Sequence, residues 1–211
     1  MKNIVLSFSF IAALFACVDV IAQTATTIEI GDRAPFSSYS MMSVDGTAVA
    51  IDDIAGENGA LVIFTCNSCP FVVGRGENTE GWEGRYNDII ALASENGIGT
   101  ILVNSNEAKR DGDDSILEMK NRARDMEYAA PYIMDEESKL ANGFGARTTP
   151  HVFLFDGDLA LIYKGSIDDN VDKASEVEEH FLRTAIERHA AGKRIKNYST
   201  RAIGCSIKRV K

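Results

Sequence analysis

Two cysteines three positions apart, Cys66 and Cys69, are the residues of this sequence best suited to covalent chemistry. They follow an apolar stretch at residues 60–64 and precede Pro70, where a buried strand is expected to give way to a helix. One turn of helix brings residues i and i+3 close enough for their sulfurs to bond. The unpaired N–H groups at the helix start are expected to favour a thiolate on Cys66. The spacing therefore predicts a dithiol that forms and breaks a disulfide.

The same cysteine spacing also occurs in metal sites and in structural disulfides. A zinc site needs a second pair of ligands with suitable spacing, and the sequence supplies none. The candidates outside the N-terminal segment are Cys205, His151, His180 and His189. A disulfide between residues so close in sequence constrains the unfolded chain little, so a purely structural role is the weaker interpretation. We expect a redox-active pair with no metal and no organic cofactor.

The elements that must position the cysteines follow from the apolar pattern. Strands are expected over 61–65, 100–104, 132–134, 151–155 and 160–163, and helices over 82–97, 115–126, 138–144 and 175–192. Ser115 and Glu118 form a capping box at the start of the second of these helices, and the last helix is expected to begin at Ser175. Glycines disfavour a continuous helix after the cysteines, so a break is expected between Gly74 and Gly81.

The order of these elements resembles the thioredoxin arrangement. A strand, a helix and a strand are followed by a further helix, a β-hairpin and a last helix, with the cysteines at the first strand–helix junction. The predicted fold class is α/β, a thioredoxin-like fold with a central mixed β-sheet flanked by helices. A turn at residues 44–47 adds an N-terminal β extension, and a basic C-terminal tail follows at residues 193–211.

Thr149 and Pro150 are the second element expected at the site. They precede a strand at the position where thioredoxin-like proteins carry a cis-proline that faces the dithiol. A cis X–Pro bond redirects the chain, so that Thr149 can offer backbone groups to an extended substrate strand. We predict that both residues bind substrate.

Several stretches together carry a resemblance to a known family. The opening at residues 31–36, GDRAPF, resembles the redoxin (AhpC/TSA-like) branch of the thioredoxin superfamily. Residues 66–72, CNSCPFV, look like the CNxCP motif of a bacterial subgroup within it. Further matches to that subgroup are GARTTP at 145–150 with FLFD at 153–156, YKG at 163–165 with IDD at 167–169, and GCSIK at 204–208. The similarity spans roughly residues 31–209.

The resemblance implies that Cys66 attacks a partner disulfide and that Cys69 resolves the mixed disulfide. Peroxiredoxins place Pro and Thr before their reactive cysteine with P-x3-T-x2-C spacing, which is missing here, so peroxide reduction and an antioxidant role are the weaker alternative. Relatives often carry His where this chain has Ser68. A second alternative is a non-enzymatic Cu(I)-handling protein, which usually needs CxxxC spacing and a well-placed histidine.

The sequence leaves the roles of Cys205 and His151 open. Cys205 is either a third redox thiol, which resolves or protects the Cys66 disulfide or pairs between chains, or a buried cysteine that packs as a small apolar group. His151 follows Pro150 and is expected to be a strand residue without catalytic work, with an approach to the dithiol as the alternative.

The N-terminus has the pattern of an export signal. Lys2 gives a positive start, an apolar stretch follows, and cleavage after Ala22 is expected. The alternative is lipidation at Cys17, in a stretch that resembles a bacterial lipobox. The expected organisation is a signal peptide over 1–22, a flexible lead-in over 23–30 and one redoxin domain over 31–192. The mature chain is expected in the periplasm, or anchored to the membrane if Cys17 is lipidated.

Charge and composition narrow the range of partners. The chain has 211 residues, of which 45% are apolar and 25% charged, as expected for a globular protein, and its formal net charge is −9. An acidic chain without a basic stripe argues against nucleic-acid binding. We expect protein disulfide or dithiol substrates and a thiol electron donor.

Overall fold

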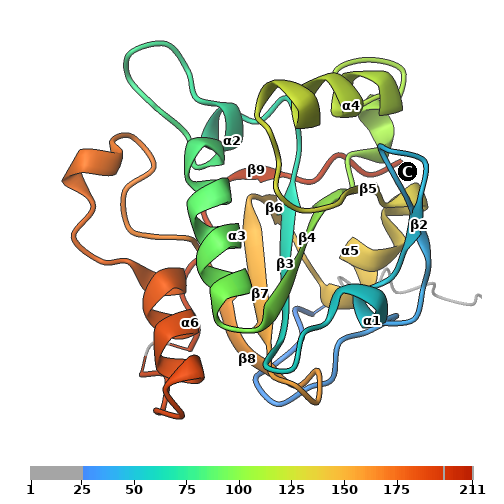
Figure 1. Cartoon of the computed structure of the whole chain (residues 1–211). Coiled ribbons are helices and arrows are strands. Elements are labelled where there is room, and N and C mark those ends of the chain that lie inside the picture. The colour runs from blue at the N-terminus through green and yellow to red at the C-terminus, as the bar shows by residue number, and fades with distance from the viewer. Residues whose placement is uncertain (1–25, 197, 211) are drawn as a thin grey trace, which may run out of the picture.

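A seven-stranded mixed sheet runs through the centre of the computed structural model, which describes residues 26–196 and 198–210 (Figure 1). Its strands, in the order β2-β1-β5-β4-β3-β7-β8, are Ala48–Val49, Met41–Ser43, Tyr132–Met134, Ile98–Asn104, Gly59–Thr65, His151–Phe155 and Leu161–Gly165. The proposed signal peptide and Cys17 lie outside the described residues. The predicted α/β class, with a mixed sheet flanked by helices, is confirmed.

The two central strands are β3 and β4, which run parallel from the Gly59–Ile98 pair to the Thr65–Asn104 pair. All residues of β3 are buried, because helices cover both faces of the sheet. β7 pairs with β3 in the antiparallel sense and continues into β8 through a hairpin. The carboxyl ends of β3 and β4 therefore meet at one edge of the sheet, where the cysteines begin.

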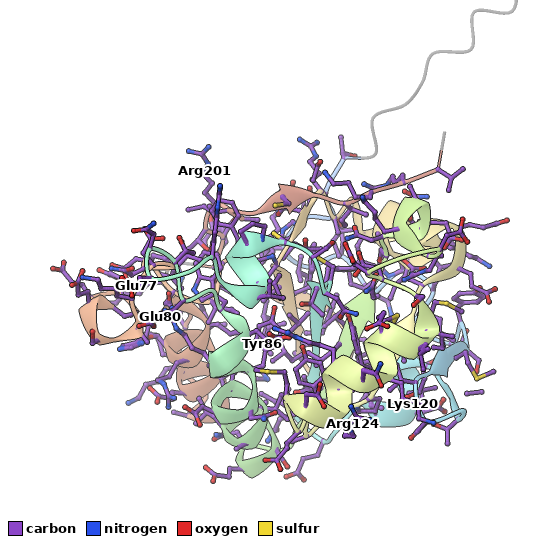
Figure 2. All side chains as sticks on the ribbon, turned by 90° about the horizontal axis from the view of Figure 1, so that it is seen from above. Glu77, Glu80, Tyr86, Lys120, Arg124 and Arg201 are labelled. Carbon is purple, nitrogen blue, oxygen red and sulfur yellow. The ribbon has the colours of Figure 1, made fainter. Side chains whose placement is uncertain are left out.

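Helices pack on both faces of the sheet and form two apolar cores. The helices are α1 (Ile51–Ile54), α2 (Pro70–Val73), α3 (Tyr86–Glu95), α4 (Ile116–Asp125), α5 (Lys139–Phe144) and α6 (Phe181–Ala190). One core receives side chains from α2, α3, α4 and α6, and the other from α1 and α5. Tyr86 of α3 lies inside the molecule, whereas Glu77 and Arg201 lie at its periphery (Figure 2). None of the helices in the described ranges is long and apolar enough to cross a membrane.

Local sequence signals set most helix boundaries correctly. The Ser115 side chain caps α4 by accepting the backbone N–H of Glu118, as predicted. The break after the cysteines is also confirmed, because α2 ends at Val73 and α3 begins only at Tyr86. The N-terminal extension forms the short hairpin β1–β2, which joins the sheet through β5.

The predicted start of the last helix at Ser175 is wrong. Residues 174–176 form a short 3-10 turn and α6 begins at Phe181. The Glu80 carboxylate accepts the backbone N–H of Ala174, and the Asp169 carboxylate accepts that of Glu178. These contacts with distant residues satisfy backbone groups that a longer helix would have used, so tertiary structure overrides the capping signal.

The C-terminal tail turns back to the body of the protein instead of lying wholly on its surface. Its strand β9 (Cys205–Ser206) pairs in the antiparallel sense with β6 (Thr148–Thr149), and the two form a separate small sheet. In Figure 1 this red segment crosses the upper end of the large sheet beside β6. Ile207 is buried in the core that α1 and α5 cover. Residues 26–30 of the expected lead-in lie against α5 and β8, where the backbone N–H of Ile28 donates to the Phe144 carbonyl.

Candidate active site

The two cysteines occupy a short loop between β3 and α2. Cys66 follows directly on Thr65, the last residue of β3, and Cys69 is the residue that precedes the first turn of α2. Pro70 is the first residue of that turn, where a backbone N–H would have no partner within the helix, so its absence costs no hydrogen bond. The helix start, which was expected to favour a thiolate on Cys66, therefore lies at Cys69. Both side chains are almost fully buried, with 1% of Cys66 and 2% of Cys69 exposed.

Thr149 touches both sulfurs. Its hydroxyl oxygen lies 3.2 Å from the sulfur of Cys66, and its carbonyl oxygen lies 3.0 Å from the sulfur of Cys69. The Thr149–Pro150 peptide bond is cis, as the sequence predicts. Residues 80 and 83 positions apart are thus joined at one point, and Thr149 is the residue that fixes the dithiol against β6.

The acidity of the two thiols differs from the sequence-based expectation. Hydrogen bonds from the Cys66 thiol, from the side chain and backbone of Cys205, and from the backbone of Phe71 lower the pKa of Cys69 to about 5, although burial opposes this. The hydrogen bond to Cys69 and burial raise the pKa of Cys66 well above its ordinary value. The reduced pair therefore holds one tightly bound proton on Cys66 and carries its negative charge on Cys69.

Ionisation also changes how Cys69 is held. A protonated Cys69 donates to the Thr149 carbonyl oxygen, but a thiolate has no proton to donate. A negative sulfur beside a carbonyl oxygen is repelled, so loss of the proton loosens the contact with Thr149. The donors that remain to Cys69 are the thiols of Cys66 and Cys205, the backbone of Phe71, and the backbone N–H of Cys205, which lies 3.4 Å from its sulfur.

A buried carboxylate that sequence reasoning missed holds the cysteine loop in place. Asp114 has no exposed surface, and its oxygens accept the backbone N–H of Asn67 at 2.7 Å and the hydroxyl of Ser68 at 3.0 Å. The side-chain amides of Asn104 and Asn106 donate to the same carboxylate. The two residues between the cysteines are thus tied to a loop more than 40 positions away. No spacing signal in the sequence connects Asp114 to the cysteines.

Tyr132 and Arg110 add further hydrogen bonds to this network. The Tyr132 hydroxyl donates to the side-chain oxygen of Asn67 at 2.9 Å. Arg110 donates to the Asp114 carbonyl and to the side-chain oxygen of Asn104. Tyr132 is buried and Arg110 half-buried, and their hydrogen bonds to the network make it more rigid.

Cys205 is the third described cysteine, and the fold brings it to the dithiol. The β6–β9 register sets Cys205 opposite Thr149, and the backbone N–H of Cys205 donates to the sulfur of Cys69 at 3.4 Å. Cys205 is half-buried and so more exposed than the other two cysteines. Burial and the neighbouring Cys69 raise the pKa of Cys205 to about 11. Cys205 packs partly buried against the cysteine-side core and also lies beside Cys69, so both alternatives from the sequence fit its position.

His151 faces away from the cysteines. It pairs with Phe64 across β3 and β7, and its ring lies 4.4 Å from that of Phe153, on the α1 and α5 side of the sheet. Successive strand residues point to opposite faces, and the neighbouring Val152 contributes to the cysteine-side core. The alternative that His151 approaches the dithiol is thus wrong.

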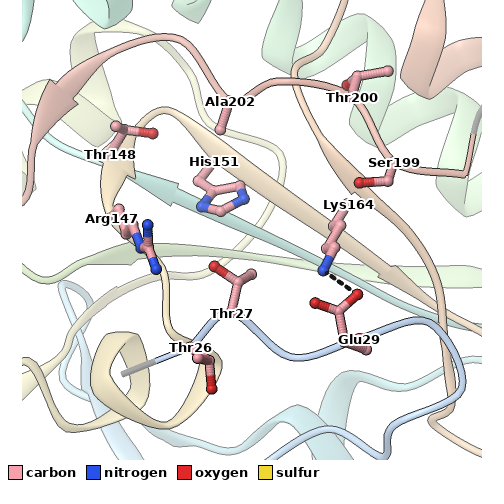
Figure 3. A pocket seen from close by; sticks show the side chains of 10 residues that line it. All are labelled: Thr26, Thr27, Glu29, Arg147, Thr148, His151, Lys164, Ser199, Thr200 and Ala202. Carbon is pink, nitrogen blue, oxygen red and sulfur yellow. Dashed lines mark ion pairs between the residues drawn. The ribbon is translucent and has the colours of Figure 1, made fainter. Parts of the chain in front are cut away.

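His151 instead lines an open cavity of about 430 Å³, together with Arg147 and Lys164 (Figure 3). Lys164 is paired there with Glu29. Burial and the two neighbouring cations lower the pKa of His151 to about 3, so its ring is neutral at ordinary pH. Among the residues that the structure describes, its Nδ1 finds no hydrogen-bond partner.

A second open cavity adjoins the cysteine loop itself. It has a volume of about 450 Å³ and lies between Asn67, Ser68 and the side chains of α4. Asp113, Glu118 and Asp125 line it, with Arg122 as the cation. The dithiol therefore lies between this acidic cavity and the C-terminal strand.

Within residues 26–196 and 198–210, no group of three or more His, Cys, Asp or Glu side chains is arranged to hold a metal ion. The geometry places two thiols, one hydroxyl and one carbonyl together, which is a set of groups suited to thiol–disulfide exchange.

Comparison with solved structures shows a common fold. An uncharacterized conserved protein from Geobacillus kaustophilus is 28% identical with a TM-score of 0.76, over 86% of this chain and 93% of that chain. The peroxidoxin BcpB of Mycobacterium tuberculosis has 11% identity and a TM-score of 0.52, over 78% and 95% of the two chains. A putative thiol:disulfide interchange protein DsbE from Chlorobium tepidum has 14% identity and a TM-score of 0.54, over 79% and 98%. The two latter proteins are similar in fold alone.

Sequence comparison gives the family. No curated protein matched the chain. The redoxin family model matches residues 29–180, which include both cysteines of the loop and the Thr149–Pro150 bond. The thioredoxin-like fold agrees with this match. The chain therefore belongs to the redoxin family and is, in general terms, a thiol oxidoreductase.

Proposed function

We propose that the protein is an exported thiol–disulfide oxidoreductase that exchanges the Cys66–Cys69 dithiol or disulfide with partner proteins. The observation that carries this proposal is that both thiols meet at Thr149, with the Cys66 sulfur 3.2 Å from its hydroxyl oxygen and the Cys69 sulfur 3.0 Å from its carbonyl oxygen. A pair in which one thiolate accepts a hydrogen bond from the neighbouring thiol is ready for exchange, because the thiolate is the reactive form of cysteine.

Cys66 is the attacking thiol that the resemblance implies, and the low pKa of Cys69 lets the Cys69 thiolate act as its base. Cys66 attacks a sulfur of the partner disulfide and transfers its proton to the Cys69 thiolate, while one partner sulfur leaves as a thiolate. The Thr149 hydroxyl donates to the Cys66 sulfur as that sulfur loses its proton. Cys69 then attacks Cys66 and gives its proton to the partner's leaving sulfur. The partner departs as a dithiol, and the Cys66–Cys69 disulfide remains.

The burial of both sulfurs means that a partner must open the site. With 1% and 2% of their side chains exposed, the cysteines cannot meet a partner disulfide in the described conformation. The backbone of Thr149 supplies hydrogen-bonding groups for an extended partner segment, and the cavity beside Asn67 and Ser68 gives room next to the loop. We therefore place the partner between Pro150 and that cavity.

The direct test is the reduction of a protein disulfide such as those of insulin. We expect reduced protein to lose two thiols for each disulfide it reduces, and Cys66→Ser to abolish the reaction. Cys69→Ser should stall with the partner bonded to Cys66. His180→Gln, an exposed change distant from the loop, is the control. A Cys66–Cys69 pair that reacts with neither dithiothreitol nor oxidised glutathione in the intact protein would overturn the proposal.

Two other functions are less well supported. Peroxide reduction is disfavoured because the sequence lacks the P-x3-T-x2-C arrangement. Measuring peroxide consumption with a thiol donor tests this function. Cu(I) handling by the two thiolates would need a third ligand, and His151 lies on the other side of the sheet. Stoichiometric Cu(I) binding without disulfide reduction would favour that alternative.

The proposed location and partners follow from the sequence. Export to the periplasm rests on the signal-like residues 1–22, with an anchor at Cys17 as the alternative. The proposed partners are protein disulfides and a thiol protein that supplies electrons. Neither nucleic acid nor an organic cofactor has a part in this mechanism. N-terminal sequencing of the protein recovered from a cell envelope fraction distinguishes cleavage after Ala22 from lipidation.

A further inference from the structure

The protein's own C-terminal strand occupies the edge at which a partner strand is expected to bind. Thr148 and Thr149 of β6 pair with Ser206 and Cys205 of β9, in the antiparallel sense. An extended partner segment that docked by strand addition would need the same backbone edge. The chain therefore presents a cysteine of its own on this edge, next to Cys69.

The strand is held in place on both sides of Cys205. After it, the backbone N–H of Ile207 donates to the Arg147 carbonyl, and that of Lys208 donates to the side-chain oxygen of Asn106. Before it, the backbone N–H of Thr200 donates to the Lys164 carbonyl, and residues 199, 200 and 202 line the open cavity of about 430 Å³ that Figure 3 shows. These contacts hold Cys205 beside Cys69, where its backbone N–H donates to the Cys69 sulfur at 3.4 Å.

We propose that Cys205 is a third redox thiol, which forms a disulfide with Cys69 and carries electrons between a partner dithiol and the buried Cys66–Cys69 pair. This inference rests on the proposed function, because it needs a Cys66–Cys69 disulfide that exchanges.

The internal step is an isomerisation that needs no outside oxidant. The Cys205 thiolate attacks the sulfur of Cys69 in the Cys66–Cys69 disulfide. The Cys69–Cys205 bond forms, the Cys66–Cys69 bond breaks, and the electron pair leaves on Cys66. Cys66 takes up the proton that Cys205 gave up, and the Thr149 hydroxyl lies 3.2 Å from its sulfur to stabilise the developing charge.

The oxidised state favours this attack. The neighbouring Cys69 raises the pKa of Cys205 by its charge and by a hydrogen bond, and both effects end when Cys69 is bonded to Cys66. Lys208 acts in the opposite direction and lowers it. Cys205 thus becomes more reactive when the dithiol is oxidised.

Electrons then enter at the more accessible sulfur. A partner thiolate attacks Cys205 in the Cys69–Cys205 disulfide, and Cys69 leaves as a thiolate. Cys69 is a good leaving group because its pKa is low, and leaving is faster for thiols of lower pKa. The second partner thiol attacks the sulfur of the first, which releases Cys205 as a thiol and the partner as a disulfide.

The first test is disulfide mapping of the full chain after oxidised glutathione, without reduction before digestion. We expect Cys66→Ser to form a Cys69–Cys205 disulfide within the monomer and Cys205→Ser to form the Cys66–Cys69 disulfide. The control combines Cys66→Ser and Cys205→Ser with Ser206→Cys. It moves the thiol to the opposite side of β9 and should give no linkage to Cys69.

The second test measures reduction rates of the oxidised protein. We expect Cys205→Ser to be reduced by a protein dithiol, reduced thioredoxin, about tenfold more slowly than the unmodified chain, with a smaller effect for dithiothreitol. Formation of Cys66–Cys69 in Cys205→Ser, without any Cys69–Cys205 linkage in Cys66→Ser, overturns the relay and leaves the proposed function standing. Equal rates with the protein dithiol also overturn it. Failure of Cys66–Cys69 to form in Cys205→Ser counts instead against the proposed function.

Discussion

The hydroxyl oxygen of Thr149 lies 3.2 Å from the sulfur of Cys66, across 83 positions of sequence. This contact lowers the pKa of Cys66 against the effects of burial and of Cys69. Thr149→Val keeps the shape of the side chain but removes the donor. In a Cys69→Ser background we expect alkylation of Cys66 to slow about tenfold, since a hydrogen bond to a charged group contributes roughly 1.5–3 kcal/mol. Thr148→Val is the control, because the Thr148 hydroxyl donates to the Pro150 carbonyl.

Thiolate absorbance near 240 nm should reveal the charge on Cys69. Because the pKa of Cys69 is lowered to about 5, we expect one thiolate per reduced molecule to appear as pH rises through about 5. Cys66→Ala removes the largest stabilising hydrogen bond and should raise that midpoint. A reduced chain in which every thiol titrates near the ordinary value of 9.0 contradicts the assignment.

The same shift contributes to stability. The folded-state pKa of Cys69 lies below its unfolded value, so the folded form binds fewer protons between pH 5 and 9. This contribution is present at pH above 9 and is lost as pH falls through the folded value. Urea unfolding between pH 5 and 9 measures this. We expect the free energy of unfolding to rise with pH more steeply in the reduced native chain than in Cys69→Ser.

Asp114→Asn should loosen the loop between the cysteines. The amide group turns one acceptor into a donor, which faces the N–H and O–H groups that now donate to Asp114. We expect the free energy of unfolding to fall by about 2 kcal/mol, because a buried donor without a partner costs roughly 1–3 kcal/mol. Disulfide reduction should slow as well. The neighbouring, exposed Asp113→Asn is the matched control, and an equal loss in both variants counts against this role.

His151 gives the protein a predictable acid sensitivity. Its folded-state pKa of about 3 lies below the ordinary 6.5, so the unfolded chain binds an extra proton between these values. Stability should therefore fall as pH drops from 6.5 towards 3, by up to about 1.4 kcal/mol per pH unit from this group. Comparing urea midpoints of the native chain and His151→Gln isolates the contribution. His180→Gln, at an exposed position, should keep the native dependence.

Gly204→Ala should displace the C-terminal strand. A Cβ atom at residue 204 would lie 2.2 Å from the Thr149 carbonyl oxygen, too close for β9 to stay on β6. We expect the variant to expose Cys69 and to speed its alkylation by several-fold or more, as roughly 1 kcal/mol of lost pairing allows. Gly84→Ala, where nothing lies within 4 Å of the new atom, is the control. Unchanged alkylation of Cys69 would show that β9 does not shield it.

The sequence alone determined the architecture and the two motifs that form the site, the cysteine pair and Thr149–Pro150. The fully apolar stretch before Cys66, the periodic helices and the hairpin predict the sheet and its helices, because each pattern depends on residues close in the chain. The cysteine pair and the Thr149–Pro150 bond were also predictable from local motifs. The start of α6 was not, because contacts from Glu80 and Asp169 replace the helical bonds of residues 174–180.

Tertiary structure alone decided how the site works. The position of Cys205 beside Cys69 joins residues 136 positions apart, and Asp114 reaches the cysteine loop from another loop. Strand register decides that His151 lies on the face of the sheet away from the cysteines. The charge is placed on Cys69 instead of Cys66 mainly because the Cys66 thiol donates to Cys69, and the further hydrogen bonds from Cys205 depend on which segments meet in space.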